Sequence, residues 1–89
     1  YYSTRENKIA VDDSIKFDIV NKVKEYCISK GYKFITLDGV KVKYDDGFAL
    51  VRASNTGPNI TTRYEAKTES RLEEITNEFN NLIYSLLNK

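Results

Sequence analysis

The segment 52–58 (RASNTGP) gathers side chains whose chemistry suits an anion. Arg52 carries a planar fork of N–H donors that matches two oxygens of a phosphate group. Ser54 and Thr56 each add a hydroxyl donor, and Asn55 adds an amide donor. Successive backbone N–H groups in a turn can point the same way and form a concave anion site. The segment therefore has the donors of a phosphate-binding loop.

The same segment is also an ordinary connection between two strands. Ser, Asn, Gly and Pro all favour turns, and an arginine at a strand end is commonly a solvated charge. Hydrogen bonds to charged groups contribute about 1.5–3 kcal/mol each before ordering costs are subtracted. The loop alone would thus hold phosphate weakly, and the residues by themselves leave both an anion site and a plain turn open.

Strands are expected on both sides of this loop. The runs Phe48–Ala53 and Ile60–Lys67 predict two strands that pair across it. Upstream, apolar residues alternate with polar ones, which indicates further strands with one covered face. Asp38-Gly39 and Asp45-Asp46-Gly47 supply turns between them. The alternating apolar residues are Tyr32, Phe34, Val40, Val42 and Tyr44.

Helical spacing of apolar residues brackets the strands. A first helix is predicted over 13–30, with Asp12 or Asp13 at its start and Gly31 as its stop. A second is predicted from Ser70, which forms a capping box with Glu73. The first apolar stripe is Phe17, Ile19, Val20, Val23, Tyr26 and Cys27, and the second is Leu72, Ile75, Phe79, Leu82, Ile83, Leu86 and Leu87.

This order predicts an α+β fold, a four-stranded antiparallel sheet with two helices packed on one face. The other face stays open, and alternation puts Arg63 on it. We expect residues 1–12 to be an interdomain hinge or linker and 13–89 to form one domain. A chain of 89 residues supports one modest core.

Composition narrows the chemistry. The net charge of +1 lacks the basic excess of a nucleic-acid binder, so any anion site must be local. The sequence has no His, and its one cysteine, Cys27, is expected in the core. Asp12, Asp13, Asp45 and Asp46 are expected to serve the local backbone. The sequence thus predicts no metal site and no catalytic residue in this chain. It also predicts no membrane span, and we expect the protein to be cytoplasmic.

Three segments together resemble the last domain of the α-D-phosphohexomutases. They are Asp38–Val42 (DGVKV), Asp46–Thr56 (DGFALVRASNT) and Arg63–Ala66 (RYEA). Asn55 and the Arg63–Ala66 run are more similar to the phosphomannomutase/phosphoglucomutase branch than to phosphoglucosamine mutases, which stay the alternative. Gly57, in the loop, and Arg5, in the expected hinge, depart from the family pattern.

The resemblance implies a four-domain isomerase whose last domain has a fold like that of the TATA-binding protein. A serine of the first domain would exchange the phosphoryl group, and Mg²⁺ would be bound by another domain. The last domain would grip the phosphate of hexose 1- or 6-phosphate that is not transferred, with Arg52, Ser54, Asn55 and Thr56 as ligands. Its partners would be the phosphosugar and the upstream domains, and the isolated fragment would not be catalytic.

Two rivals of other classes remain from the residues. Asp46–Val51 (DGFALV) faintly resembles the aromatic strand of RNA-recognition modules. Leu50 and Ala53 stand where further stacking aromatics belong, which leaves too few rings. The second rival is a non-catalytic anion-binding module without an enzyme around it.

Overall fold

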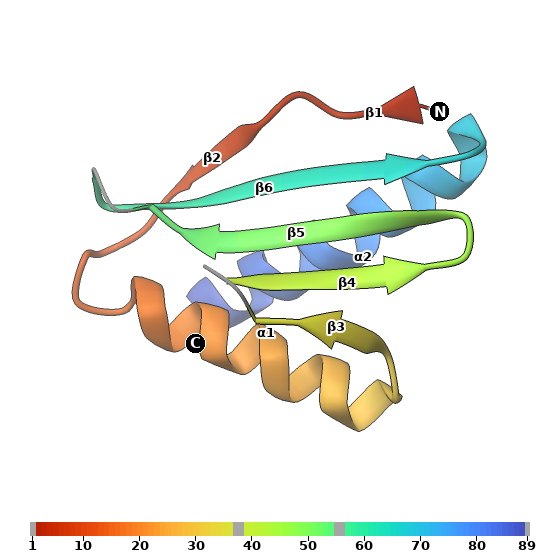
Figure 1. Cartoon of the computed structure of the whole chain (residues 1–89). Coiled ribbons are helices and arrows are strands. Elements are labelled where there is room, and N and C mark those ends of the chain that lie inside the picture. Colours follow the sequence, from red (N-terminus) through yellow and green to blue (C-terminus); the bar gives the residue numbers. More distant parts are fainter. Residues whose placement is uncertain (1, 37–38, 55–56, 89) are drawn as a thin grey trace.

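Strands and helices follow one another in the order β-β-α-β-β-β-β-α. The computed structural model describes residues 2–36, 39–54 and 57–88. Both helices contact β5 and β6 and also each other, so they cover the same face of the sheet (Figure 1). The elements are β1 (Tyr2–Ser3), β2 (Asn7–Ala10), α1 (Lys16–Lys30), β3 (Lys33–Ile35), β4 (Val40–Tyr44), β5 (Gly47–Ala53), β6 (Asn59–Ala66) and α2 (Glu69–Leu87).

The two-layer α+β arrangement is confirmed, but the expected strand count was wrong. Within the described residues the sheet has six strands in the order β1-β6-β5-β4-β3, and β2 also pairs with β6. All pairings are antiparallel. The two extra strands come from the segment 1–12, whose role as a hinge stays a prediction, as does the likeness to the TATA-binding protein.

The extra strands share one edge of β6. Ser3 is opposite Glu65, and Asn7 is opposite Thr62. The three residues between Ser3 and Asn7 therefore lie opposite only two residues of β6. One extra residue of this kind is a bulge, which bends an edge strand. Only Ile9 of β2 is buried, so the segment carries too little alternation to predict a strand. The segment is a strand because its backbone pairs with β6.

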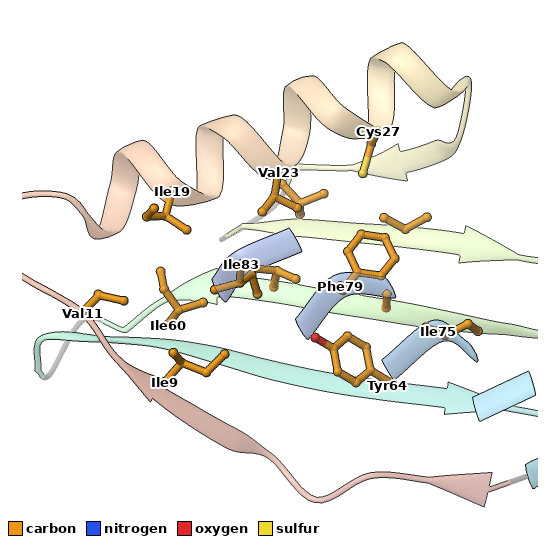
Figure 2. Close-up of a cluster of buried hydrophobic side chains, with 14 of the residues drawn as sticks. Ile9, Val11, Ile19, Val23, Cys27, Ile60, Tyr64, Ile75, Phe79 and Ile83 are labelled. Atoms are coloured by element: carbon orange, nitrogen blue, oxygen red, sulfur yellow. The ribbon is translucent and has the colours of Figure 1, made fainter. Parts of the chain in front are cut away.

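The core lies between the helices and the inward residues of the sheet (Figure 2). Strand alternation puts every second residue of β4, β5 and β6 into it. The helices contribute residues spaced about one turn apart. The buried apolar residues are Ile9, Val11, Ile19, Val23, Cys27, Val40, Val42, Ala49, Val51, Ile60, Tyr64, Ala66, Ile75, Phe79 and Ile83.

Helix α1 begins later than the sequence predicts. The Asp12 carboxylate accepts from the backbone N–H of Ser14 at 2.9 Å, and this turn precedes the first helical residue, Lys16. Phe17 is 65% exposed, so its place in the apolar stripe was wrong. The stop at Gly31 is confirmed, with φ at 72° and N–H bonds back to the last turn.

Helix α2 is capped two residues before the predicted capping box. Thr68 is the N-cap, and its hydroxyl accepts from the N–H of Arg71 at 3.1 Å. Ser70 therefore lies inside the helix. The apolar stripe is confirmed at Ile75, Phe79 and Ile83. Neither helix, over the ranges that the structure describes, combines the length and apolar character needed to cross a membrane.

Two tyrosine hydroxyls join the elements at the far end of α1. Tyr26 Oη and Tyr32 Oη donate to the same oxygen, Glu78 Oε2, at 2.7 and 2.6 Å. These bonds tie α1 and the residue before β3 to α2. Desolvation is the main cause that raises the pKa of Tyr26. The hydrogen bond to Glu78 is the main cause that raises the pKa of Tyr32.

We expect stability to fall as the pH rises above about 10. Both phenols have a folded pKa above the ordinary value of 10.0, so the folded chain holds their protons more tightly than the unfolded chain. Their contribution is complete below that value and is lost as the pH rises towards the folded pKa. Urea denaturation at about pH 8 and about pH 11 should show a smaller loss for Tyr26→Phe/Tyr32→Phe than for the wild type. Equal losses would contradict this assignment.

Cys27 should be nearly inert in the folded chain. Its side chain is fully buried, and burial raises the pKa of the thiol to about 11. Because the thiolate is the reactive form, labelling requires the structure to open. At about pH 8 we expect an aromatic disulfide reagent to label it at least about a hundredfold more slowly than in the urea-unfolded chain. Equal rates in the two states would show an accessible thiol.

Candidate functional site

The alternation of β5 decides which way Arg52 points. Ala49 and Val51 face the helices and are fully buried, so Arg52 lies on the opposite, open face. It is the last residue but one of β5 and is paired with Thr61 of β6. Its side chain is 44% exposed. A guanidinium therefore reaches solvent where the strand ends.

The guanidinium of Arg52 is only weakly engaged. One terminal nitrogen lies 3.3 Å from Glu6 Oε1, and ion pairs this exposed contribute about 0–1 kcal/mol. The Arg52 Nε atom is buried and has no hydrogen-bond partner among the described residues. A buried N–H without an acceptor costs about 1–3 kcal/mol. The exposed end of the guanidinium thus keeps donors that an oxyanion could use, and a turn of the side chain would bring Nε to it as well.

Gly39, just before β4, lies against the backbone of Val51 and Arg52. A Cβ atom at Gly39 would lie 2.6 Å from Arg52 Cβ and 2.6 Å from the Val51 carbonyl oxygen. The φ angle of Gly39 is 138°, a conformation that other residues rarely adopt. The sequence marks Gly39 only as a turn residue, because the close approach depends on a strand that is distant in the chain.

Ser54 follows β5 and is 8% exposed. Its backbone N–H donates to the Asn59 carbonyl at 3.0 Å. Its backbone carbonyl accepts from Lys16 Nζ at 2.8 Å. Both backbone groups of Ser54 are therefore engaged, so a bond from this residue to an anion would have to come from the hydroxyl. The other two expected ligands, Asn55 and Thr56, lie outside the described residues.

The end of the β5–β6 connection is tied to the chain that leads into α1. The Pro58 carbonyl accepts from the N–H of Val11 at 3.0 Å, and the Gly57 carbonyl accepts from Asn59 N–H at 2.9 Å. The first of these bonds joins two segments that are far apart in the sequence. The connection is therefore anchored by the N-terminal segment as well as by its own strands.

Lys16 contributes a contact that the sequence analysis missed. It is the first residue of α1 and is 7% exposed. Its Nζ atom lies 2.8 Å from the Ser54 carbonyl and 3.4 Å from the Gly57 carbonyl. Its helical spacing could have predicted this burial, since Lys16 lies on the same face of α1 as Ile19 and Val23.

The aspartates expected to serve the local backbone differ among themselves. Asp12 confirms that expectation through its bond to Ser14. Asp13 instead pairs with Lys16, Oδ1 to Nζ at 2.7 Å. Asp46 uses its carboxylate on Arg71 of α2 at 3.1 Å. Among the described residues, no group of three or more His, Cys, Asp or Glu could hold a metal ion.

The open face of the sheet is basic although the chain is nearly neutral. Arg63 is exposed and paired with Leu50, which places it on this face as expected. Lys41 Nζ lies 4.5 Å from the centre of the Phe48 ring and covers it. The carboxylates beside these cations include Glu65 and Glu6, the partner of Arg52. The register and alternation of the strands put the following cations on the open face: Lys8, Lys33, Lys41, Lys43, Arg52 and Arg63.

An exposed guanidinium among other cations offers the local charge and the hydrogen-bond donors that an anion site requires. Comparison with known families gives a match to the phosphoglucomutase/phosphomannomutase C-terminal domain over residues 6–82. A phosphomannomutase/phosphoglucomutase of Pseudomonas syringae pv. tomato is 43% identical over 77 residues, which cover 86% of this chain and 17% of the relative. A phosphoglucomutase/phosphomannomutase of Thermococcus kodakarensis is 52% identical over 56 residues, which cover 63% of this chain and 12% of the relative.

A solved structure of the same family has a similar fold. The crystal structure of a phosphoglucomutase/phosphomannomutase family protein from Burkholderia thailandensis matches 94% of this chain and 17% of that chain, with a TM-score of 0.76 and 29% sequence identity. The chain thus spans about a sixth of the length of such relatives. Because the family match takes in most of the sequence, the chain belongs to the phosphoglucomutase/phosphomannomutase family and corresponds to its C-terminal domain.

Proposed function

We propose that this domain grips the phosphate of a hexose 1- or 6-phosphate that is not being transferred, within a full-length phosphohexomutase. Arg52, Ser54, Asn55 and Thr56 are the proposed ligands. The observation that carries the proposal is the state of Arg52. Its guanidinium reaches solvent at the end of β5, and its buried Nε lacks an acceptor among the described residues.

Binding of a phosphate would replace a weak contact by stronger ones. The pair between Arg52 and Glu6 is long and half-exposed, so little is lost when the guanidinium turns to another anion. A phosphate accepts two parallel N–H bonds from one guanidinium. The cations of the open face, such as Arg63 and Lys41, add an attractive potential around the site.

The proposed contribution of this domain to catalysis is positioning. Fixing one phosphate of the sugar orients the other end towards the reacting groups. Phosphoryl transfer is assigned to the upstream domains. The described residues of this chain do not fit a Mg²⁺ site, and the metal that the family implies would be held elsewhere in the enzyme.

The other candidate functions have less support. An RNA-binding sheet needs open aromatic faces, and the Phe48 ring is covered by Lys41 at 4.5 Å. The relatives compared here are named for mannose and glucose phosphates and not for glucosamine phosphate. A free-standing anion-binding module does not account for relatives that are about five times as long as this chain. Cytoplasmic location follows as part of the same proposal.

Arg52→Ala in the full-length enzyme should lower kcat/KM by roughly ten- to a hundredfold, since it removes charged hydrogen bonds of about 1.5–3 kcal/mol each. Steady-state kinetics with glucose 1-phosphate and mannose 1-phosphate measure the effect. Lys43→Ala is the matched control, because Lys43 is another cation of the open face but pairs with Phe48 at the far half of β5. Arg52→Ala kinetics equal to those of Lys43→Ala would remove the proposed role.

A further inference from the structure

Lys16 is a buried cation with no role in the proposed function as stated so far. Its side chain is 8% exposed, yet it lies at the beginning of a helix, where a lysine usually reaches solvent. Burying an ammonium group is costly unless every N–H finds an acceptor. The acceptors around Nζ therefore indicate the role of Lys16.

The three N–H donors of Lys16 have three acceptors. Asp13 Oδ1 lies at 2.7 Å, the Ser54 carbonyl at 2.8 Å and the Gly57 carbonyl at 3.4 Å. With its donors engaged in this way, the ammonium group has no donor left for an anion. Lys16 is thus not itself a phosphate ligand.

The two carbonyls contacted by Lys16 belong to the residues that stand on either side of Asn55 and Thr56 in the sequence. Ser54 directly follows β5, and Gly57 lies two residues before β6. One ammonium group that binds both carbonyls fixes the distance between the two ends of the connection. It also directs both carbonyl oxygens, which would repel a phosphate, towards α1.

We propose that Lys16 is a positioning residue, which clamps the backbone of Ser54 and of Gly57 in the geometry that phosphate binding at this end of β5 requires. This inference rests on the proposed function for its ligand but on separate contacts for its geometry. The clamp also links the site to the N-terminal segment, since Val11 N–H donates to the Pro58 carbonyl at 3.0 Å.

Two variants separate this clamp from a general effect on folding. Lys16→Met keeps most of the side-chain volume and removes the N–H donors. Lys22→Met is the matched control, because Lys22 lies on the same helix and pairs with Asp18 at 3.5 Å while both side chains are well exposed. Asp13→Asn removes the charge of the partner but leaves both carbonyl contacts in place.

Amide hydrogen exchange of the 89-residue chain measures the clamp directly. In Lys16→Met, the amides of Ser54 and Asn59, which close this connection, should exchange about tenfold faster, while that of Phe79 in the core changes little. Lys22→Met should leave all three unchanged, and Asp13→Asn should change them by less than about threefold. Unchanged exchange at Ser54 and Asn59, or an equal rise at Phe79, would overturn the clamp.

Kinetics of the full-length enzyme then test the link to phosphate. Lys16→Met should raise KM for glucose 1-phosphate by about tenfold, with a smaller change in kcat. If Arg52→Ala lowers kcat/KM but Lys16→Met acts no differently from Lys22→Met, the proposed function stands and the positioning role falls. If Arg52→Ala has no effect, the proposed function fails and the positioning role falls with it, whatever the exchange data show.

Discussion

The covering of a single sheet face is the constraint on which the rest of this domain depends. Successive residues of a strand point to opposite sides, so burial of Ala49 and Val51 beneath the helices forces Leu50 and Arg52 outward. The packing of its neighbours in β5 therefore places the Arg52 side chain on the open face of the sheet. The same alternation leaves a basic face on a chain whose net charge is only +1. Local charge can thus arise without a basic composition.

The connection that follows Arg52 is bound by both layers of the domain. The β5–β6 connection belongs to the sheet, but its carbonyls are bound by the first residue of α1. A buried ammonium group needs such acceptors, since desolvation would otherwise cost several kcal/mol. The contact therefore satisfies the lysine and fixes the connection at the same time. At the other end of α1, the bonds of Tyr26 and Tyr32 to Glu78 join the same layers away from the site.

The regular parts of the fold were predictable because their signals are local. Gly31 ends α1 since a residue without a Cβ tolerates a φ of 72°. The inward stripe of α2 follows from helical spacing. The edge strands β1 and β2 were not predictable in this way, because only Ile9 of β2 is buried. Their pairing is decided by hydrogen bonds to β6, a strand about fifty to sixty residues further along the chain. The cap of α2 was misplaced because Thr68 and Ser70 both carry the hydroxyl that a cap needs.

The sequence by itself determined the α+β class, the resemblance to the phosphohexomutases and the strand end that carries Arg52, because alternation, turn residues and donor chemistry are written in neighbouring positions. Tertiary structure alone decided that Lys16 is buried against the carbonyls of Ser54 and Gly57 and that Gly39 lies against Arg52. Those contacts join residues that are distant in the chain. Their geometry follows from how the helices pack on the sheet, which no local pattern of residue types contains.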